Sequence, residues 1–331
     1  MNKKPNIAIV GATGLVGSTF RTVLEERNFP FENVYMMASA KSAGQEVTFN
    51  GKEYIVEELT EDSFKKDIDI ALFSAGGSTS KKFAPIAAKD GVIVIDNSSQ
   101  WRMDKDVPLV VPEVNPDEAF KHKGIIANPN CSTIQAMVPL KPLHDKYKIK
   151  RIVYSTYQAV SGSGIKGIND LKEGIRGNDI MSAYPHPIAG NCIPHIDVFL
   201  DNGYTKEEMK MVNETRKILG DDNIGITVTT VRVPVFDCHS ETINVEFQKP
   251  FDIKEIKPLL EDFPGIVVAD DPANNVYPLA REVAGKDEVY VGRIRRDESI
   301  ENGLNFWCVA DNIRKGAATN AVQIAELLIN K

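Results

Sequence analysis

The sequence lacks the features of membrane, secreted or nucleic-acid-binding proteins. None of its apolar runs approaches the roughly 20 residues of a membrane-spanning helix, and its first residues lack the apolar core of a secretory signal. Lys and Arg form no basic stripe, and the net charge is -7. We therefore expect a cytoplasmic protein that binds neither membrane nor nucleic acid.

Cysteine is also scarce. The chain has four, Cys131, Cys192, Cys238 and Cys308, and no two of them have CxxC spacing. This scatter disfavours a zinc site and a disulfide framework, and it suits a reducing compartment. A cysteine with a function here would therefore act as a single thiol.

With 331 residues, the chain has room for two domains. In the first part, short apolar segments alternate with segments of helical periodicity, which predicts a doubly wound parallel sheet. Asn50-Gly51 predicts the turn of a hairpin over residues 45–57. The other expected strands are residues 6–10, 34–38, 69–74, 92–96, 109–111 and 124–127, and the expected helices are 15–27 and 79–89.

After Cys131 the expected strands become longer, and apolar and polar residues alternate more regularly along them. This pattern suits an antiparallel or mixed sheet with one covered face. Pro139 and Pro142 are expected to bend or break the helix that follows the cysteine. The amphipathic segment 317–329 is expected to pack back on the first domain. The expected strands are 150–160, 224–235, 241–248, 288–295 and 304–309, and the further helices are 205–219 and 253–262.

A glycine loop, Gly11-Ala12-Thr13-Gly14-Leu15-Val16-Gly17, follows the first strand and opens the first helix. Glycines let the backbone approach a pyrophosphate, and a helix N-terminus attracts its charge. The spacing is GxxGxxG instead of GxGxxG, so its position after a strand carries the prediction of a dinucleotide site. The alternative is a tight turn without a ligand.

The end of the second strand distinguishes the cofactors. NAD sites usually have a carboxylate there for the ribose hydroxyls, and none is present between Met36 and Gly44. Ser39, Lys41 and Ser42 could instead bind a 2′-phosphate, which favours NADP. The alternative is a solvated loop with an ordinary lysine.

Cys131 lies between an apolar segment and a helix-capable one, in Asn128-Pro129-Asn130-Cys131-Ser132-Thr133. A helix N-terminus lowers the pKa of a nearby thiol, and the thiolate is the nucleophile. Alone, the cysteine could be a small core residue. Combined with the nucleotide loop, it predicts hydride chemistry on a thiol-bound carbonyl.

Acid–base and anion-binding residues are harder to rank. Any of five histidines could move a proton, namely His122, His144, His186, His195 and His239. Arg232 alternates with Val231 and Val233, so it can face a site while they face a core. Glu207 and Lys210 are three residues apart on one helix face; they could form a functional pair or a solvated one.

Ordered motifs over nearly the whole chain resemble aspartate-β-semialdehyde dehydrogenase. They are GATGLVG, ASAKSAG, SAGGSTS, DNSSQWR, NPNCSTIQ, YQAVSGSG, EEMKMVNET, RVPVFDCHSE and GAATNAVQIAE. The family usually has Arg where this chain has Lys41. Lysine keeps the charge and loses the planar fork, so the preference for NADP could be looser.

The resemblance implies a Rossmann-type NADP-binding domain over residues 1–130, with residues 315–331 packed back on it. It implies an α+β catalytic and dimerisation domain with a mixed, largely antiparallel sheet over residues 131–314. The implied reaction is reversible reductive dephosphorylation of β-aspartyl phosphate to aspartate semialdehyde through a cysteine thioester, for lysine, threonine and methionine biosynthesis. Homodimers or dimers of dimers are implied, and no metal.

The resemblance also assigns residues. Cys131 is the nucleophile, His239 the acid–base group and Gln158 a further catalytic contact, whereas Cys238 is structural. Arg232 binds the α-carboxylate. The other substrate or phosphate residues are Arg102, Asn130, Glu207 and Lys210. The implied cofactor residues are Gly11, Thr13, Gly14, Leu15, Val16, Ser39, Lys41, Ser42, Ser161, Gly162 and Asn320.

Three alternatives remain open. N-acetylglutamyl-phosphate reductase and glyceraldehyde-phosphate dehydrogenase also join a nucleotide domain to a cysteine domain. The NPNCST motif and the segment from Arg232 to His239 disfavour both of these enzymes. A non-catalytic NADP-binding regulatory protein would keep the glycine loop but would not need Cys131, His239, Arg102 and Arg232 together.

Overall fold

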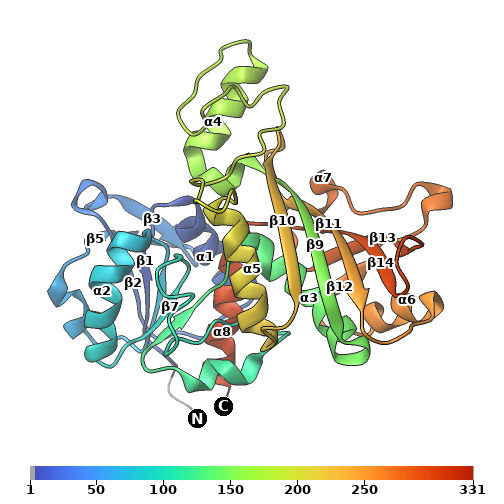
Figure 1. Cartoon of the computed structure of the whole chain (residues 1–331). Coiled ribbons are helices and arrows are strands. Elements are labelled where there is room, and N and C mark those ends of the chain that lie inside the picture. Colours follow the sequence, from blue (N-terminus) through green and yellow to red (C-terminus); the bar gives the residue numbers. More distant parts are fainter. Residues whose placement is uncertain (1–3, 331) are drawn as a thin grey trace. The chain divides into compact units, whose positions relative to one another are not determined.

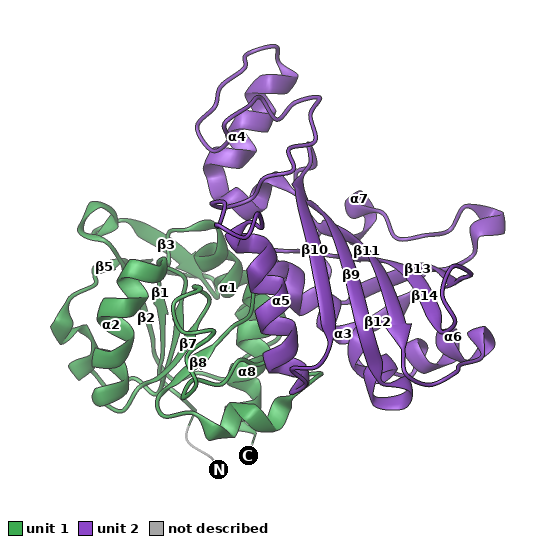
Figure 2. Cartoon of the chain, viewed as in Figure 1, with its two compact units in different colours: residues 1–130, 317–331 green, residues 131–316 purple. Residues whose placement is uncertain are grey.

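The computed structural model describes residues 4–330 and divides into two compact units (Figure 2). Unit 1 comprises residues 1–130 and 317–331, and unit 2 comprises residues 131–316. Within residues 4–330, no helix combines the length and the apolar character needed to cross a bilayer.

Unit 1 is built on a six-stranded parallel sheet in the order β5-β2-β1-β6-β7-β8. The predicted doubly wound fold is confirmed, because β1 lies between β2 and β6 and the chain order reverses there. The predicted strand 109–111 is wrong, since only an isolated bridge joins Leu109 to Ala127. The strands are β1 (Ile7–Val10), β2 (Val34–Ala38), β5 (Glu57–Glu58), β6 (Ile70–Phe73), β7 (Ile93–Asp96) and β8 (Ile125–Ala127).

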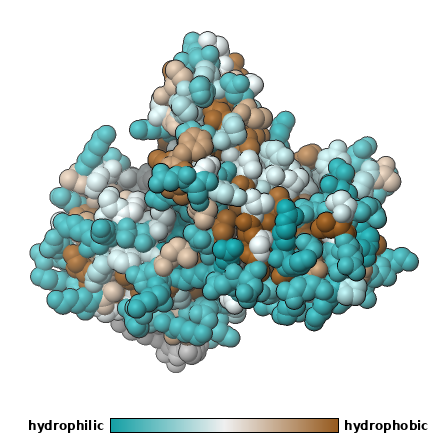
Figure 3. Space-filling model, in the orientation of Figure 1, coloured by the Kyte–Doolittle hydropathy of each residue, from teal (hydrophilic) through white to brown (hydrophobic). Residues whose placement is uncertain are grey.

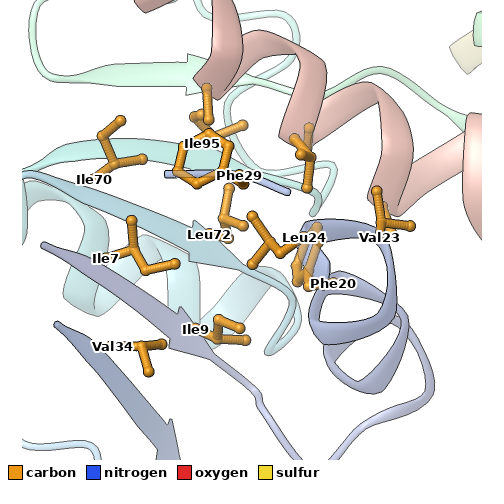
Figure 4. Packing of buried hydrophobic residues seen from close by; sticks show 14 of the residues in the cluster. Ile7, Ile9, Phe20, Val23, Leu24, Phe29, Val34, Ile70, Leu72 and Ile95 are labelled. Carbon is orange, nitrogen blue, oxygen red and sulfur yellow. The ribbon is translucent and has the colours of Figure 1, made fainter. Parts of the chain in front are cut away.

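Helices cover both faces of this sheet. Figure 1 shows α2 (Gly77–Lys89) on one side and α1 (Leu15–Glu26) with α8 (Thr319–Ile329) on the other. Side chains of α1, α8 and the central strands form a continuous apolar core (Figure 4). The predicted hairpin is also present, as β3 (Glu46–Phe49) and β4 (Lys52–Ile55), with positive φ at both turn residues.

Unit 2 has a six-stranded mixed sheet in the order β10-β9-β11-β14-β13-β12. Three of the five neighbouring pairs are antiparallel, whereas β10–β9 and β12–β13 are parallel. The predicted fold class is therefore confirmed for this unit as well. The strands are β9 (Ile149–Gln158), β10 (Gly225–Arg232), β11 (His239–Phe247), β12 (Ile266–Val268), β13 (Val289–Asp297) and β14 (Gly303–Ala310).

The helix after Cys131 differs from the prediction. It runs without a break as α3 (Cys131–Tyr147), through both Pro139 and Pro142. A proline at 139 removes the N–H that would bond the carbonyl of Gln135. That carbonyl accepts a hydrogen bond from the Cys308 thiol instead, at 3.6 Å. Tertiary packing thus replaces the bond that the proline removes.

The remaining helices of unit 2 are α4 (Gly164–Ile175), α5 (Lys206–Leu219), α6 (Ile253–Glu261) and α7 (Ala280–Val283). Helices α3 and α5 pack against the same sheet, on the face that carries Gln158 and His239. On the opposite face Tyr157 and Trp307 contact each other. In the space-filling view, hydrophobic side chains interrupt the hydrophilic surface where these strands lie in Figure 1 (Figure 3).

Candidate active site

Unit 1 contains a pocket of about 490 Å³ at the carboxyl ends of β1, β2 and β6. This is the edge at which open parallel sheets bind ligands. Of the predicted cofactor residues, Gly11, Thr13, Gly14 and Ser39 line it. The other lining residues are Ala38, Leu59, Ser74, Ala75, Thr79 and Phe83.

The glycines of the loop are required by close backbone contacts. Gly11 has a φ of +88°, and a Cβ there would lie 2.4 Å from the carbonyl oxygen of Ser74. A Cβ on Gly17 would lie 2.1 Å from the carbonyl oxygen of Gly11. The loop therefore folds tightly against the strand ends and leaves the start of α1 beside the pocket, so these residues fit a dinucleotide phosphate.

The remaining cofactor candidates in the loops are close to this pocket in sequence but do not line it. Leu15 and Val16 form the first turn of α1, where backbone N–H groups lack helical acceptors. Lys41 is exposed in a short 3₁₀ helix, Ala40–Ser42, directly after the pocket residue Ser39. Lys41 and Ser42 are thus placed where a second-strand loop could contact a 2′-phosphate.

Arg102 is buried in unit 1, and backbone carbonyls hold its guanidinium. Its Nε donates to the carbonyl of Asn128 and its second terminal nitrogen to that of Asn97, both at 2.9 Å. The preceding turn is fixed by Asp96, whose carboxylate accepts from the backbone and hydroxyl of Ser98. Burial raises the pKa of Asp96.

Asn320 and Asn130 lie elsewhere in unit 1. Asn320 is completely buried, and its amide nitrogen donates to the Val110 carbonyl at 2.9 Å and to Asn128 Oδ1 at 2.7 Å. Asn130 is also buried. Neither of them lines the 490 Å³ pocket.

Cys131 is the first residue of α3 and is partly exposed. The backbone of Gly316 lies directly against it, because a Cβ on Gly316 would be 2.9 Å from the Cys131 Cβ. One turn along α3, Gln135 donates from Nε2 to the His239 carbonyl at 3.3 Å. The helix that begins at the thiol is therefore tied to the first residue of β11.

His239 is completely buried and is held in one tautomer. Its Nδ1 accepts the backbone N–H of Ala159 at 3.0 Å, so the hydrogen of the neutral ring lies on Nε2. Nε2 has no partner within residues 4–330. Burial, and then the charge of Arg232, lower the pKa of His239 well below its ordinary value. The ring is neutral at pH 7 and presents an N–H.

Arg232 lies beside this imidazole. It donates to the Ala159 carbonyl at 2.6 Å, and its Nε has no partner among the described residues. A Cβ on Gly162 would be 2.7 Å from an Arg232 terminal nitrogen and 3.1 Å from His239 Cε1. Gly162 itself is exposed, so the turn leaves an open approach to both side chains.

Gln158, Glu207 and Lys210 form a connected set on the same face. Gln158 donates from Nε2 to Glu207 Oε1 at 3.3 Å, and Lys210 donates to Glu207 Oε2 at 2.9 Å. The pairing expected from their spacing is thus present, and Lys210 also contacts Asp197 at 2.9 Å. Burial opposes the charge of Lys210, but the two carboxylates outweigh it and raise its pKa.

The other candidates are less involved. Ser161 is buried and accepts from Asn312 Nδ2 at 3.0 Å. Cys238 is buried with a positive φ of 69°, and burial raises the pKa of its thiol. All four cysteines are thiols. No cluster of three or more potential metal ligands occurs in the described part of the chain.

Sequence reasoning missed Gln135, Gly316 and Glu241. Gln135 follows Cys131 by one helical turn, which was a usable signal. Gly316 is far from Cys131 in the sequence, and only the fold brings it there. Glu241 is completely buried two residues after His239, where an alternating strand predicts the same face.

Comparisons with known proteins agree over nearly the whole chain. The family described as "Semialdehyde dehydrogenase, NAD binding domain" matches residues 6–122, and "Semialdehyde dehydrogenase, dimerisation domain" matches residues 140–315. An aspartate-semialdehyde dehydrogenase of Aquifex aeolicus is 60% identical over 98% of both chains.

Solved structures agree as well. Aspartate semialdehyde dehydrogenase II of Vibrio cholerae, complexed with ASA, is 49% identical with a TM-score of 0.96, over 100% of this chain and 99% of that one. The enzyme of Candida albicans with NADP is 26% identical with a TM-score of 0.79, over 98% of each chain.

Proposed function

The chain belongs to the aspartate-semialdehyde dehydrogenase family of oxidoreductases, and we propose that it interconverts β-aspartyl phosphate and aspartate semialdehyde with NADP. It would do so in the cytoplasm, for lysine, threonine and methionine synthesis. One observation carries the proposal. In unit 2, the helix that begins at Cys131 is bonded through Gln135 to His239, and His239 lies beside Arg232 and the open Gly162 turn.

Cys131 is the proposed nucleophile. Its thiolate adds to the aldehyde carbon and forms a thiohemiacetal, whose oxidation leaves a thioester. Phosphate then attacks the thioester carbon, the C–S bond breaks and the thiolate is restored. The covalent intermediate divides one difficult step into two easier ones. NADP, when bound, supplies the hydride acceptor for the oxidation.

His239 is the proposed proton-handling group. Because Nδ1 already accepts the Ala159 N–H, any exchange with the substrate oxygen passes through Nε2. In the neutral ring this atom donates a hydrogen bond to the oxygen on which negative charge develops. The lowered pKa of His239 keeps that donor uncharged at pH 7.

Different side chains are proposed to bind different parts of the substrate. Arg232 has an unused Nε, and we propose that it binds the α-carboxylate, for which a planar fork is suited. Gln158 and Glu207 would contact the polar end of the substrate, while Lys210 and Arg102 would bind phosphate. Asn130 is proposed to support phosphate or substrate binding.

Unit 1 is proposed to hold the cofactor. Gly11, Thr13, Gly14 and Ser39 already line the pocket, and the first turn of α1 offers N–H groups from Leu15 and Val16. Lys41 and Ser42 would contact the 2′-phosphate. Ser161, Gly162 and Asn320 are the remaining proposed cofactor contacts.

Unit 2 is proposed to form a homodimer through the sheet face opposite α3 and α5. A cavity of about 350 Å³ on this face is lined by Thr242, Tyr277, Pro278, Leu279, Arg293, Arg295 and Trp307. Tyr157 is 37% exposed beside Trp307 although both side chains are large and aromatic. A second copy of the chain is the occupant that the dimerisation family predicts.

The test follows NADPH absorbance after mixing protein, aspartate semialdehyde, phosphate and NADP. We expect phosphate-dependent reduction that falls by about 10³-fold or more in Cys131→Ala, because the nucleophile is gone. Cys192→Ala removes an exposed thiol and should retain activity. Full activity in Cys131→Ala, or reduction that does not need phosphate, would overturn the proposal.

A further inference from the structure

Glu241 is a buried acid that the proposed mechanism does not use. It lies on β11 two residues after His239, so the two side chains point to the same face of the sheet. The strand register places it opposite Thr156 on β9 and Cys308 on β14. Its exposed fraction is 0%, and neither carboxyl oxygen has a partner within residues 4–330.

Side chains on α3, β9 and α5 form hydrogen bonds around Glu241 that reach the candidate active site. From α3, Gln135 bonds the His239 carbonyl through its side chain and the Cys308 thiol through its own carbonyl. On β9, the Thr156 hydroxyl accepts from Gln158 Nε2 at 3.3 Å. The same nitrogen of Gln158 also donates to Glu207 on α5. Glu241 therefore lies on the sheet face that carries His239 and Gln158, next to residues bonded to both Gln158 and α3.

A negative charge on Glu241 is disfavoured by its surroundings. Two buried carboxylates repel each other, and an unpaired one is costly in a dry interior. Glu207 accepts from Lys210 and Gln158, which favours its charged form, whereas Glu241 has no such donors. Burial, and then the neighbouring Glu207, raise the pKa of Glu241 well above its ordinary value. Burial, and then Glu241, in turn raise that of the Cys308 thiol.

We propose that Glu241 is a positioning residue that acts as a neutral carboxylic acid: it leaves the negative charge beside Lys210 and Gln158 to Glu207, and it supports the polar layer around Thr156, through which Gln158 is held. Its O–H remains to donate a hydrogen bond in this layer, where Gln135 Oε1 is another buried atom without a partner among the described residues. An apolar side chain of similar size would offer this layer neither a donor nor an acceptor.

The effect on catalysis rests on the proposed function, whereas the protonation state does not. Glu241→Gln keeps a neutral group with a donor and an acceptor, and Glu241→Met keeps only the volume. In Glu241→Met we expect kcat/KM for aspartate semialdehyde to fall about tenfold, because small displacements of positioned groups are costly. KM for NADP should be unchanged, and Glu241→Gln should restore kcat/KM to within about twofold of wild type.

Infrared difference spectra between wild type and Glu241→Gln at pH 7 test the proton without any substrate. The proposal requires a protonated-carboxyl C=O band that Glu241→Gln lacks. Absence of that band would overturn the proposal, because it would show that Glu241 is ionised. Equal losses in both variants would also overturn it, because a neutral donor and acceptor would then not replace the acid. Wild-type kinetics in Glu241→Met would overturn the positioning role.

Ile243→Val is the matched control, because Ile243 is the next buried residue of β11 on this face. It should lower the melting temperature while leaving KM unchanged. If the Met variant does not fold, the infrared band and the Gln variant still decide the question. A protein without activity on aspartate semialdehyde would refute the proposed function and leave the infrared result interpretable.

Discussion

At the scale of single residues, the neutral state of His239 is the feature with the most direct consequence. Its Nδ1 faces a backbone N–H, so a proton on this nitrogen would place two donors against each other. The nearby guanidinium of Arg232 and the complete burial act in the same direction. Protonation of the imidazole must therefore disrupt the site that it belongs to.

This predicts a loss of stability in acid. The unfolded chain binds a proton on His239 below about pH 6.5, while the native state, with its lowered pKa, does not. Stability from this residue thus falls as the pH drops from about 6.5 toward the lowered pKa, by up to about 1.4 kcal/mol per pH unit.

Urea unfolding of wild type and His239→Asn between pH 7.5 and 5.5 measures this effect. Asparagine can still accept the Ala159 N–H but cannot be protonated, so the variant should lose less stability in acid. Half-buried His122 and buried His144, whose pKa values burial also lowers, contribute equally to both proteins. Identical pH dependence would contradict the assignment.

Sequence reasoning succeeded at this scale where the signal was local. The spacing of Glu207 and Lys210 predicted that they could pair, and they do. Alternation on the strand predicted that Arg232 and its neighbours Val231 and Val233 face opposite sides of the sheet. It failed for Glu241 because the burial of a carboxyl group depends on β9 and β14, which lie far away in the sequence. The sequence around a charged residue does not reveal which helices cover it.

At the scale of elements, the turn from Ala159 to Gly164 holds the side chains of both His239 and Arg232. Its backbone bonds both His239 and Arg232, and Gly162 lies against them without a side chain. A methyl group at 162 would be 2.7 Å from the Arg232 guanidinium, which is closer than side-chain contacts allow. The turn thus sets the distance between the guanidinium and the imidazole.

Gly162→Ala is therefore expected to lower kcat/KM for aspartate semialdehyde by about 10²-fold, since both groups must move. Activity should fall more than stability, because position 162 itself is exposed and only the contacts with Arg232 and His239 are disturbed. Steady-state kinetics and thermal unfolding check this. Gly225→Ala is the control, because a Cβ there meets its first neighbour at 3.7 Å, and it should behave like wild type.

Helix α8 is a second element with a defined contribution. Ile324 is completely buried in the core that α8 shares with α1 and β1, and Arg27 on α1's C-terminal side pairs with Glu326 at 2.6 Å. Ile324→Ala should reduce the free energy of unfolding by about 2–5 kcal/mol. Leu328→Ala, at a partly buried position, should cost less. Equal losses in urea unfolding would show that α8 packs differently.

Element boundaries followed the sequence pattern closely where packing agreed with local preference. The Asn50-Gly51 turn and the buried parallel strands are such cases. The effect of Pro139 could not be predicted. The thiol that bonds the released Gln135 carbonyl belongs to Cys308, which lies 173 residues further along the chain. Helix α4 was not predicted either.

At the scale of the whole molecule, fold class was readable from the sequence because alternating strands and helices permit few arrangements. The two units and their sheets follow from that pattern. Association between copies is not encoded in the same way, since it depends on which side chains the sheet of unit 2 leaves on its open face.

Thr242→Arg tests the proposed dimer. Thr242 is exposed on β11, opposite Trp307 in the strand register, so an arginine there would place a charge in the middle of the face. We expect the variant to sediment as a monomer at concentrations where wild type is a dimer. Thr22→Arg, on the exposed side of α1, should leave sedimentation unchanged. A monomeric wild type would remove the proposal.

The return of the chain to unit 1 also governs how the protein is made. The core of unit 1 needs Ala321, Val322 and Ile324, which the ribosome adds only after all of residues 131–316. Until then, Phe20 and Val23 on α1 lack part of their covering and could bind chaperones. During translation, the unit that is begun first is therefore the one that is finished last.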